Sequence, residues 1–168
     1  MRFFIIFATL VVVLFSVEVT YPIQNALVVP FTSTIARTSA DLIGLWDAGV
    51  FASGKIIRHQ SDGFAISVEA GCNGVEAGII LTAAIVAFPS SWLHKVVGIT
   101  VGLASLQALN IARIISLFYL GRWNQSAFEW AHLYIWQALI MLDVLIAFLI
   151  WLRFLPRPAT RPLGASGG

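Results

Sequence analysis

Three residues of this chain have side chains that could together carry out acyl transfer: Cys72, Arg113 and His132. Cys72 is the only cysteine, so it cannot form a disulfide within the chain. A thiol attacks a peptide carbonyl as the thiolate, which a nearby histidine or cation favours. The histidine can then protonate the leaving amine, and a fixed guanidinium can stabilise the oxyanion of the intermediate. These residue types predict a cysteine acyl-transfer site.

Each of the three side chains also has a purely structural interpretation. A lone cysteine in a membrane protein often fills a small apolar space. An arginine near the end of a span can reach the lipid headgroups, and a histidine there can simply be an interfacial residue. The combination is more informative, because ionisable groups within apolar runs are costly and are functional candidates by default. We therefore treat Cys72, Arg113 and His132 as candidate catalytic residues.

Three polar residues are candidates for a supporting role. Asn110 lies three residues before Arg113, on the same helix face, and could either orient it or form a hydrogen bond between helices. Glu76 lies four residues after Cys72 and shares its face if the helix starts early. Glu76 could orient His132 or Arg113, or it could form a structural hydrogen bond. Asn73, next to Cys72, completes the set.

The composition indicates an integral membrane protein. The 168 residues are 59% hydrophobic and 11% charged, with a mean hydropathy of +0.89. Soluble domains usually carry about 25% charged residues. The formal net charge of +2 is too small to suggest nucleic-acid binding, and the basic residues are better interpreted as topology signals in a lipid bilayer.

The apolar runs predict one all-α integral membrane domain, residues 1–168, with about four transmembrane helices. The spans are expected at residues 3–20, 73–89, 96–120 and 130–152. The first run resembles a signal peptide because a basic residue precedes it. However, no Ala-x-Ala-like cleavage site follows it, and we interpret it as a retained span.

Charge places the two sides of this topology. Four spans put both termini on one side, together with a set of basic residues and no acidic residue: Arg2, Lys95, Arg153, Arg157 and Arg161. The positive-inside rule makes that side cytoplasmic, with 153–168 as a basic tail. Residues 21–71 then face outward, and Cys72, Arg113 and His132 fall at the outer ends of their spans. Arg113 lies roughly 10 Å below the predicted helix end, within reach of that surface.

The extracytoplasmic segment 21–71 is predicted to contain a helix and a β-hairpin. Thr38 or Ser39 could cap a helix that continues past Gly49 and lies on the membrane surface or packs as a loop helix. Residues 55–60 and 64–70 are predicted to be strands joined by a tight turn at 61–63, because apolar residues alternate in the second one. This gives a small α/β-hairpin segment before the second span.

At this point three short motifs resemble a known family. Gly71-Cys72-Asn73-Gly74, then Asn110-Ile111-Ala112-Arg113, then Ala131-His132, is similar to the exosortase/archaeosortase family in order, spacing and placement at span ends. Its members are polytopic membrane transpeptidases with a Cys/Arg/His site. The resemblance covers about residues 64–153. The short chain is most similar to exosortase H, a compact bacterial type.

The resemblance implies roles for these residues and a class of substrate. Cys72 would be the nucleophile, His132 the acid and base, and Arg113 the oxyanion or carbonyl partner. The substrates would be secreted proteins with a C-terminal sorting tail, consisting of a short Ile-Pro-Thr-Leu-like motif, a membrane helix and a basic cluster. The protein would lie in the bacterial cytoplasmic (inner) membrane with its site facing the periplasm. The acceptor stays open between water, lipid and glycan.

Two features depart from the family pattern. A small residue such as serine commonly follows the cysteine, where this chain has Asn73. Many members also have about eight spans, against four expected here.

The alternative hypothesis is a non-catalytic transporter subunit or assembly factor. Arg113 with Glu76 or Asp143 would then line a polar path. Asp143 lies eleven residues after His132, on the same face and roughly 16 Å deeper, where it could relay protons or act as a structural acid. No cofactor or metal is expected, because the histidines lie in different segments and a structural zinc site would need more cysteines.

Overall fold

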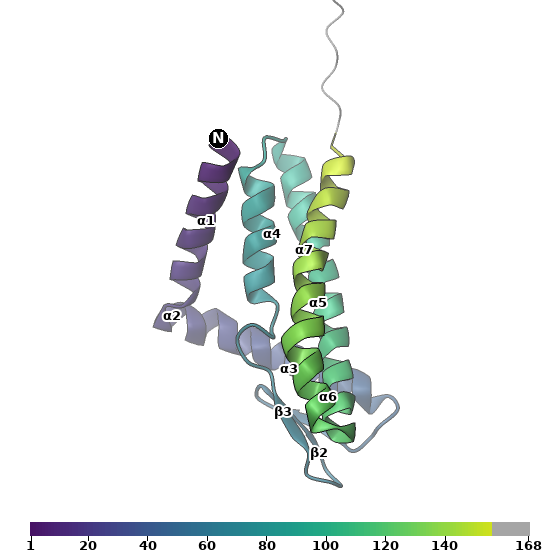
Figure 1. The fold of residues 1–168 in the computed structure, drawn as a ribbon. Helices are drawn as coiled ribbons and strands as arrows, with labels where there is room; N and C mark the ends of the chain where they lie inside the picture. The colour runs from purple at the N-terminus through teal and green to yellow at the C-terminus, as the bar shows by residue number, and fades with distance from the viewer. Residues whose placement is uncertain (156–168) are drawn as a thin grey trace, which may run out of the picture.

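The computed structural model describes residues 1–155 and shows a mostly helical protein with a small antiparallel sheet (Figure 1). Four helical segments lie side by side: α1 (Arg2–Glu18), α4 (Val75–Ala87), α5 (Trp92–Trp123) and α7 (Trp136–Arg153). A further helical run crosses one end of this bundle, and the sheet lies beyond it. From residue 156 onward, the predicted basic tail lies outside the described residues.

Length and composition identify two to three candidate membrane spans. Trp92–Trp123 has 32 residues, and Gln125–Arg153 has 29 residues. The second comprises α6 (Gln125–Trp130), the π-helical turn η2 (Ala131–Ile135) and α7. α1 is long and apolar enough for a membrane span only if it is counted together with Tyr21–Gly44, and the two segments are bent by 71° relative to each other. α4 is apolar but has only 13 residues, and a span of the bilayer core takes about 20.

The helical run after α1 is longer and starts earlier than predicted. It consists of α2 (Tyr21–Ile23), the π-helical turn η1 (Gln24–Val28) and α3 (Val29–Gly44). The predicted cap at Thr38 or Ser39 is wrong, since both lie inside α3. The reason is that the buried face of this helix starts well before them. It comprises Thr32, Ile35, Ala36, Ser39, Ala40 and Ile43, at helical spacing.

The sheet has three strands in the order β1-β2-β3, namely β1 (Val50–Ser53), β2 (Ile56–His59) and β3 (Ala65–Ser67). The predicted hairpin is present as β2 and β3, with shorter strands, and Ile57 faces Ile66 in its register. β1 occupies the sequence just beyond Gly49, where a helix was predicted, and that part of the prediction is wrong. It pairs antiparallel with β2 across a short turn, from Val50 opposite His59 to Ser53 opposite Ile56, so a local hairpin forms there in place of the helix.

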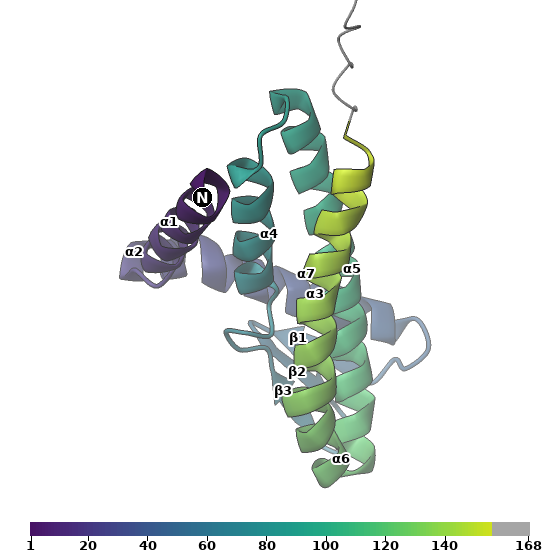
Figure 2. The same cartoon turned by 45° about the horizontal axis from the view of Figure 1, so that its top comes forward.

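Two apolar clusters hold these parts together. In the first, the inner face of the sheet packs against α3 and α5 through the buried side chains of Ile43, Ile57, Val68, Ile114 and Phe118. Figure 2 shows the sheet beside the lower half of the α6–α7 helix. The second cluster lies between α4, α5 and α7 and contains Leu81, Ile85, Leu106, Val144 and Trp151.

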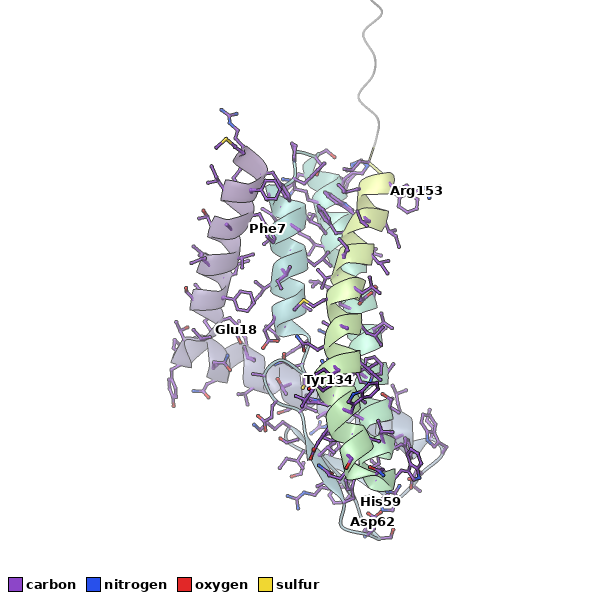
Figure 3. The ribbon with its side chains drawn as sticks, in the orientation of Figure 1. Phe7, Glu18, His59, Asp62, Tyr134 and Arg153 are labelled. Carbon is purple, nitrogen blue, oxygen red and sulfur yellow. The ribbon has the colours of Figure 1, made fainter. Side chains whose placement is uncertain are left out.

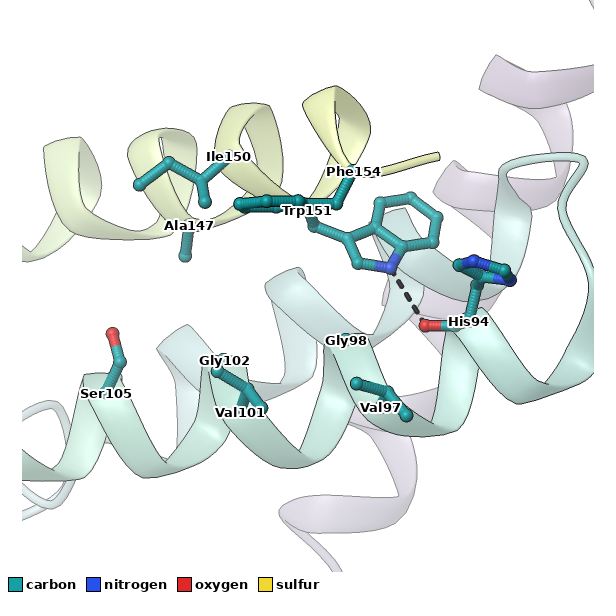
Figure 4. A pocket seen from close by; sticks show the side chains of 10 residues that line it. All are labelled: His94, Val97, Gly98, Val101, Gly102, Ser105, Ala147, Ile150, Trp151 and Phe154. Atoms are coloured by element: carbon teal, nitrogen blue, oxygen red, sulfur yellow. Dashed lines mark hydrogen bonds between the residues drawn. The ribbon is translucent and has the colours of Figure 1, made fainter. Parts of the chain in front are cut away.

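Trp151 connects the C-terminal end of α7 to the N-terminal end of α5 (Figure 4). Its Nε1 donates a hydrogen bond to the main-chain oxygen of His94 at 2.9 Å. The indole lies against Gly98, where an added Cβ would come within 2.3 Å of the ring. A shallow apolar groove of about 430 Å³ borders this contact. It lies at the end of the bundle near Arg153, opposite the end that carries His59 and Asp62 (Figure 3).

Candidate active site

Cys72 lies in a tight loop between β3 and α4. Gly71 and Gly74 flank the loop and both have positive φ, +80° and +79°, which favours glycine over other residues. The main-chain nitrogen of Gly71 donates to Glu76 Oε1 at 2.7 Å, and that of Cys72 donates to the oxygen of Glu69 at 2.9 Å. These bonds give the cysteine a defined position just before α4 begins.

Asn73 connects the same loop to the neighbouring helices by hydrogen bonds. It is 1% exposed, and its Nδ2 donates to Thr32 Oγ1 on α3 at 3.0 Å. Its Oδ1 accepts a bond from the nitrogen of Val75, and its main-chain oxygen accepts one from Gln107 Nε2 on α5 at 3.3 Å. A serine could not reach as many partners, so the asparagine after the cysteine joins α3, α4 and α5 at this point.

Arg113 extends from α5 to the cysteine loop and is almost fully buried, at 1% exposure. Its Nη1 donates to the oxygen of Gly71 at 3.2 Å, and its Nη2 lies 3.5 Å from Cys72 Sγ. Within residues 1–155, no carboxylate oxygen lies within 4 Å of the guanidinium, and its Nε has no partner. A buried cation without a carboxylate is costly, and here its hydrogen bonds go to the Cys72 loop.

His132 reaches the cysteine from the opposite helix. Its Nε2 lies 3.9 Å from Cys72 Sγ. The imidazole stacks on Phe128, with the ring centres 5.7 Å apart and the planes 8° from parallel. Its Nδ1 is buried and has no partner within residues 1–155. The residue lies in η2, a π-helical turn, and such turns are frequent at functional sites.

The structure thus brings Cys72, Arg113 and His132 together, and we call them the Cys–Arg–His trio. They line a small recess of about 40 Å³, together with residues of β3 and of α5. That volume can hold one or two water-sized groups. The recess is therefore large enough for a carbonyl oxygen beside the thiol but not for a bulky side chain.

Burial dominates the electrostatics of the thiol. It raises the pKa of Cys72 above its usual value, the positive charge of Arg113 opposes this, and the negative charge of Glu76 adds to it. The resting cysteine is therefore a neutral thiol at neutral pH. A base must take its proton when it attacks, and His132 is the one ring nitrogen at contact distance within the described residues.

The other predicted polar residues occupy different places. Asn110 is buried but makes no hydrogen bond to Arg113; its Nδ2 lies 3.5 Å from Gln107 Oε1. Glu76 bonds to the main chain of the cysteine loop and to neither Arg113 nor His132. Asp143 is half-buried on α7, next to a residue of the second apolar cluster. Of the residues that the structure describes, neither acid lines the recess that Arg113 lines.

A protein-family model described as "Transmembrane exosortase (Exosortase_EpsH)" matches residues 2–155. The chain belongs to the transmembrane exosortase family. Members of this family are transpeptidases. A search of the curated proteins found no match to the chain, and a search of the solved structures found none either.

Sequence reasoning missed three residues that shape the site of this exosortase. Phe128 lies four residues before His132, and that spacing could have predicted the stacking contact. Gln107 precedes Asn110 and Arg113 at three-residue intervals on α5, which also places it on their face. Thr32 has no such signal, because it lies 41 residues from Asn73 and only the folded chain joins them.

Proposed function

We propose that the chain is a cysteine transpeptidase that cleaves the C-terminal sorting tail of secreted proteins through a thioester on Cys72. The observation that carries the proposal is the shared contact at one sulfur. Arg113 Nη2 lies 3.5 Å from Cys72 Sγ, and His132 Nε2 lies 3.9 Å from it. A cation and a base on either side of a thiol is the arrangement that cysteine acyl transfer needs.

The first half-reaction forms the thioester. His132 takes the proton of the Cys72 thiol as Sγ attacks the carbonyl carbon of the scissile peptide bond, which forms a C–S bond and a tetrahedral oxyanion. Arg113 stabilises that oxyanion by hydrogen bonding. When the intermediate collapses, the C–N bond breaks and the leaving amine takes the proton from His132. The tail departs, and the secreted protein stays on Cys72 as an acyl group.

The second half-reaction releases the product. A nucleophile, either water or an amine or hydroxyl of an acceptor, gives its proton to His132 and attacks the thioester carbonyl. The C–S bond then breaks, the new acyl bond stays, and Cys72 recovers its proton from His132. Side chains of this chain supply every proton transfer in both halves.

The support for Arg113 as the oxyanion donor is its position and its lack of other charge partners. Its guanidinium already contacts the nucleophilic atom, and no carboxylate within residues 1–155 neutralises it. The Nη1 group that bonds to Gly71 is held in place before the reaction starts. Donors that are fixed in advance act without the cost of reorganisation when charge develops.

We further infer a four-pass topology with the trio at the outer membrane surface. α1, α4, α5 and the α6–α7 helix would be the spans, with α4 completed by the non-helical residues on either side. Arg113 lies 21 residues after Trp92, at which α5 begins, or about 32 Å along the helix. The hydrocarbon core is about 30 Å thick, so a span that starts at Trp92 leaves Arg113 at the opposite interface.

The same topology supports a location in the bacterial cytoplasmic membrane with the trio facing the periplasm. The start of α1, where Arg2 lies (Figure 1), and Arg153 (Figure 3) are at the end of the bundle away from the sheet, which is the cytoplasmic end by the positive-inside rule. A tail with a membrane helix would present the bond that precedes this helix at the level of the trio. We propose an Ile-Pro-Thr-Leu-like motif there, as in exosortase H, and a lipid or glycan as acceptor.

The test is co-expression with a secreted reporter protein whose C-terminus carries that motif, a membrane helix and an arginine cluster. Wild type and Cys72→Ala are compared by gel and by intact mass of the reporter. We expect tail loss with wild type only. Equal tail loss with both proteins would remove Cys72 as the nucleophile, and no tail loss with wild type would refute the proposed substrate class.

A further inference from the structure

β3 is an edge strand, and the hydrogen bonds around it show which of its groups are free. His59 donates to the oxygen of Phe64, and Val68 donates to the oxygen of Lys55. In an antiparallel ladder, residues alternate between those that bond to the partner strand and those that face away. Ile66 therefore bonds to β2, as Phe64 and Val68 do, while the N–H and C=O groups of Ala65 and Ser67 face the open edge.

A groove runs along this open edge. It has a volume of about 230 Å³, and one side is formed by four consecutive residues, Phe64 to Ser67. Alternate side chains of a strand point to opposite faces of its sheet. Since all four residues line the groove, it follows the edge of the strand and not one face. Gln125 and Phe128 of α6 form the other side, and we call this feature the edge groove.

The edge groove leads to the Cys–Arg–His trio. Ile66, Ser67 and Phe128 line both the edge groove and the recess that holds Cys72 Sγ, so the two lie next to each other. Within residues 1–155, no strand pairs with β3 on this side. A row of unpaired main-chain groups at an edge can bind an added strand.

We propose that the substrate binds as an extended strand added to the free edge of β3, with its scissile bond beyond Ser67 at Cys72. Main-chain hydrogen bonds to Ala65 and Ser67 would hold the residues before that bond. Strand addition is a recurrent way to bind peptides, because main-chain groups give affinity and alternate side chains give specificity. The proposal rests on the transpeptidase function and names the binding mode of its substrate.

The topology also predicts the direction of the added strand. β3 runs from its outer end at Ala65 toward Ser67 and then to Cys72, which lies just before α4. A substrate whose C-terminal tail enters the membrane runs the same way, from outside to the bilayer. The added strand is therefore parallel to β3, and its residues before the scissile bond lie between β3 and α6.

A proline at Ser67 is the first test. Ser67→Pro removes the N–H that faces the edge groove and leaves the ladder with β2 intact, and proline is tolerated on the open side of edge strands. Ser67 Oγ also donates to Glu69 at 2.7 Å, so Ser67→Ala is the matched control. We expect processing of the reporter at low concentration to fall by roughly two- to tenfold in Ser67→Pro relative to Ser67→Ala, the value of one hydrogen bond.

Cross-linking tests the same geometry without turnover. In a Cys72→Ala background, Ser67→Cys is combined with reporters that carry one cysteine at each of the six residues before the cleavage site. Ser53→Cys, an exposed site on β1 at the far edge of the sheet, is the control. We expect disulfides at alternate reporter positions with Ser67→Cys only, because successive side chains of a strand point to opposite faces.

These experiments separate failure of the binding mode from failure of the function. Processing by wild type but not by Cys72→Ala establishes the transpeptidase. If the two Ser67 variants then process equally and the cross-links lack the alternation or match those of Ser53→Cys, strand addition is refuted while the transpeptidase stands. The binding mode would be established if Ser67→Cys forms cross-links at alternate reporter positions and Ser67→Pro folds but processes the reporter more slowly than Ser67→Ala.

Discussion

Replacing Arg113 by methionine separates a catalytic from a structural role for this buried cation. Methionine has a similar length and no charge, so the substitution removes the donors to Gly71 and to Cys72 Sγ without leaving a large cavity. Loss of one oxyanion donor typically slows a reaction by about 100- to 1000-fold. We expect a decrease of that size in tail cleavage by Arg113→Met.

The stability of Arg113→Met should change much less. The substitution removes the donor to the oxygen of Gly71, which costs roughly 0.5–1.5 kcal/mol because Gly71 is exposed and its oxygen can bond to water instead. It also removes the desolvation penalty of a charge that has no carboxylate within 4 Å among the described residues, and apolar replacement of buried charges is often neutral or stabilising by about 1–4 kcal/mol. The two effects offset each other, so the thermal midpoint in detergent should shift by only a few degrees.

Arg122, on the same helix, is the matched control. It pairs with Asp47 at 3.1 Å and with Asp62 at 2.9 Å, and it does not line the recess. Arg122→Met should therefore leave tail cleavage near wild type and lower stability, by roughly 1–3 kcal/mol for the lost charged hydrogen bonds to a side chain that is 25% exposed.

Cleavage and thermal unfolding of both variants check this reasoning. Alkylation of Cys72 adds a third measurement, because the Arg113 charge lowers the pKa of this thiol and its removal should slow iodoacetamide at a fixed pH. Cleavage by folded Arg113→Met within tenfold of wild type would refute the oxyanion role. Equal loss of cleavage in both arginine variants would point to a structural effect of α5.

Three further predictions follow from single contacts. The negative charge of Glu76 raises the pKa of Cys72, so Glu76→Gln should speed labelling of Cys72 by iodoacetamide at pH 8. An unchanged or slower rate would contradict this. In wild type and in Glu76→Gln, the labelling rate should increase as the pH rises toward and beyond 9. Asn73→Ala should lower the free energy of unfolding by roughly 1–3 kcal/mol through loss of its buried hydrogen bonds, and it should slow tail cleavage. Unchanged cleavage would show that the cysteine loop does not need these hydrogen bonds. Gly98→Ala forces its Cβ against Trp151 and should cost roughly 1–3 kcal/mol in thermal unfolding, with cleavage per folded molecule unchanged.

The local parts of the fold could be predicted because their signals are short-range. The apolar runs indicated a helical membrane protein, and alternation around a tight turn predicted the β2–β3 hairpin. The predicted start of the helix before β1 is wrong, although Thr38 and Ser39 are residue types that favour a cap position. In α3 these residues lie in the middle of an amphipathic helix whose buried face packs on the sheet and α5, and tertiary packing of that kind overrides a local cap signal.

Residue type and order are enough to identify which residues could do acyl-transfer chemistry and which family the motifs resemble. How those residues meet depends on the packing of the folded chain. Arg113 and His132 lie 41 and 60 residues from Cys72, yet both contact its sulfur. Asn73 bonds to Thr32 across 41 residues, and Glu76 bonds to the Gly71 main chain, a choice that depends on where α4 begins. Such contacts depend on packing of distant segments and on buried groups finding partners, which no local pattern records.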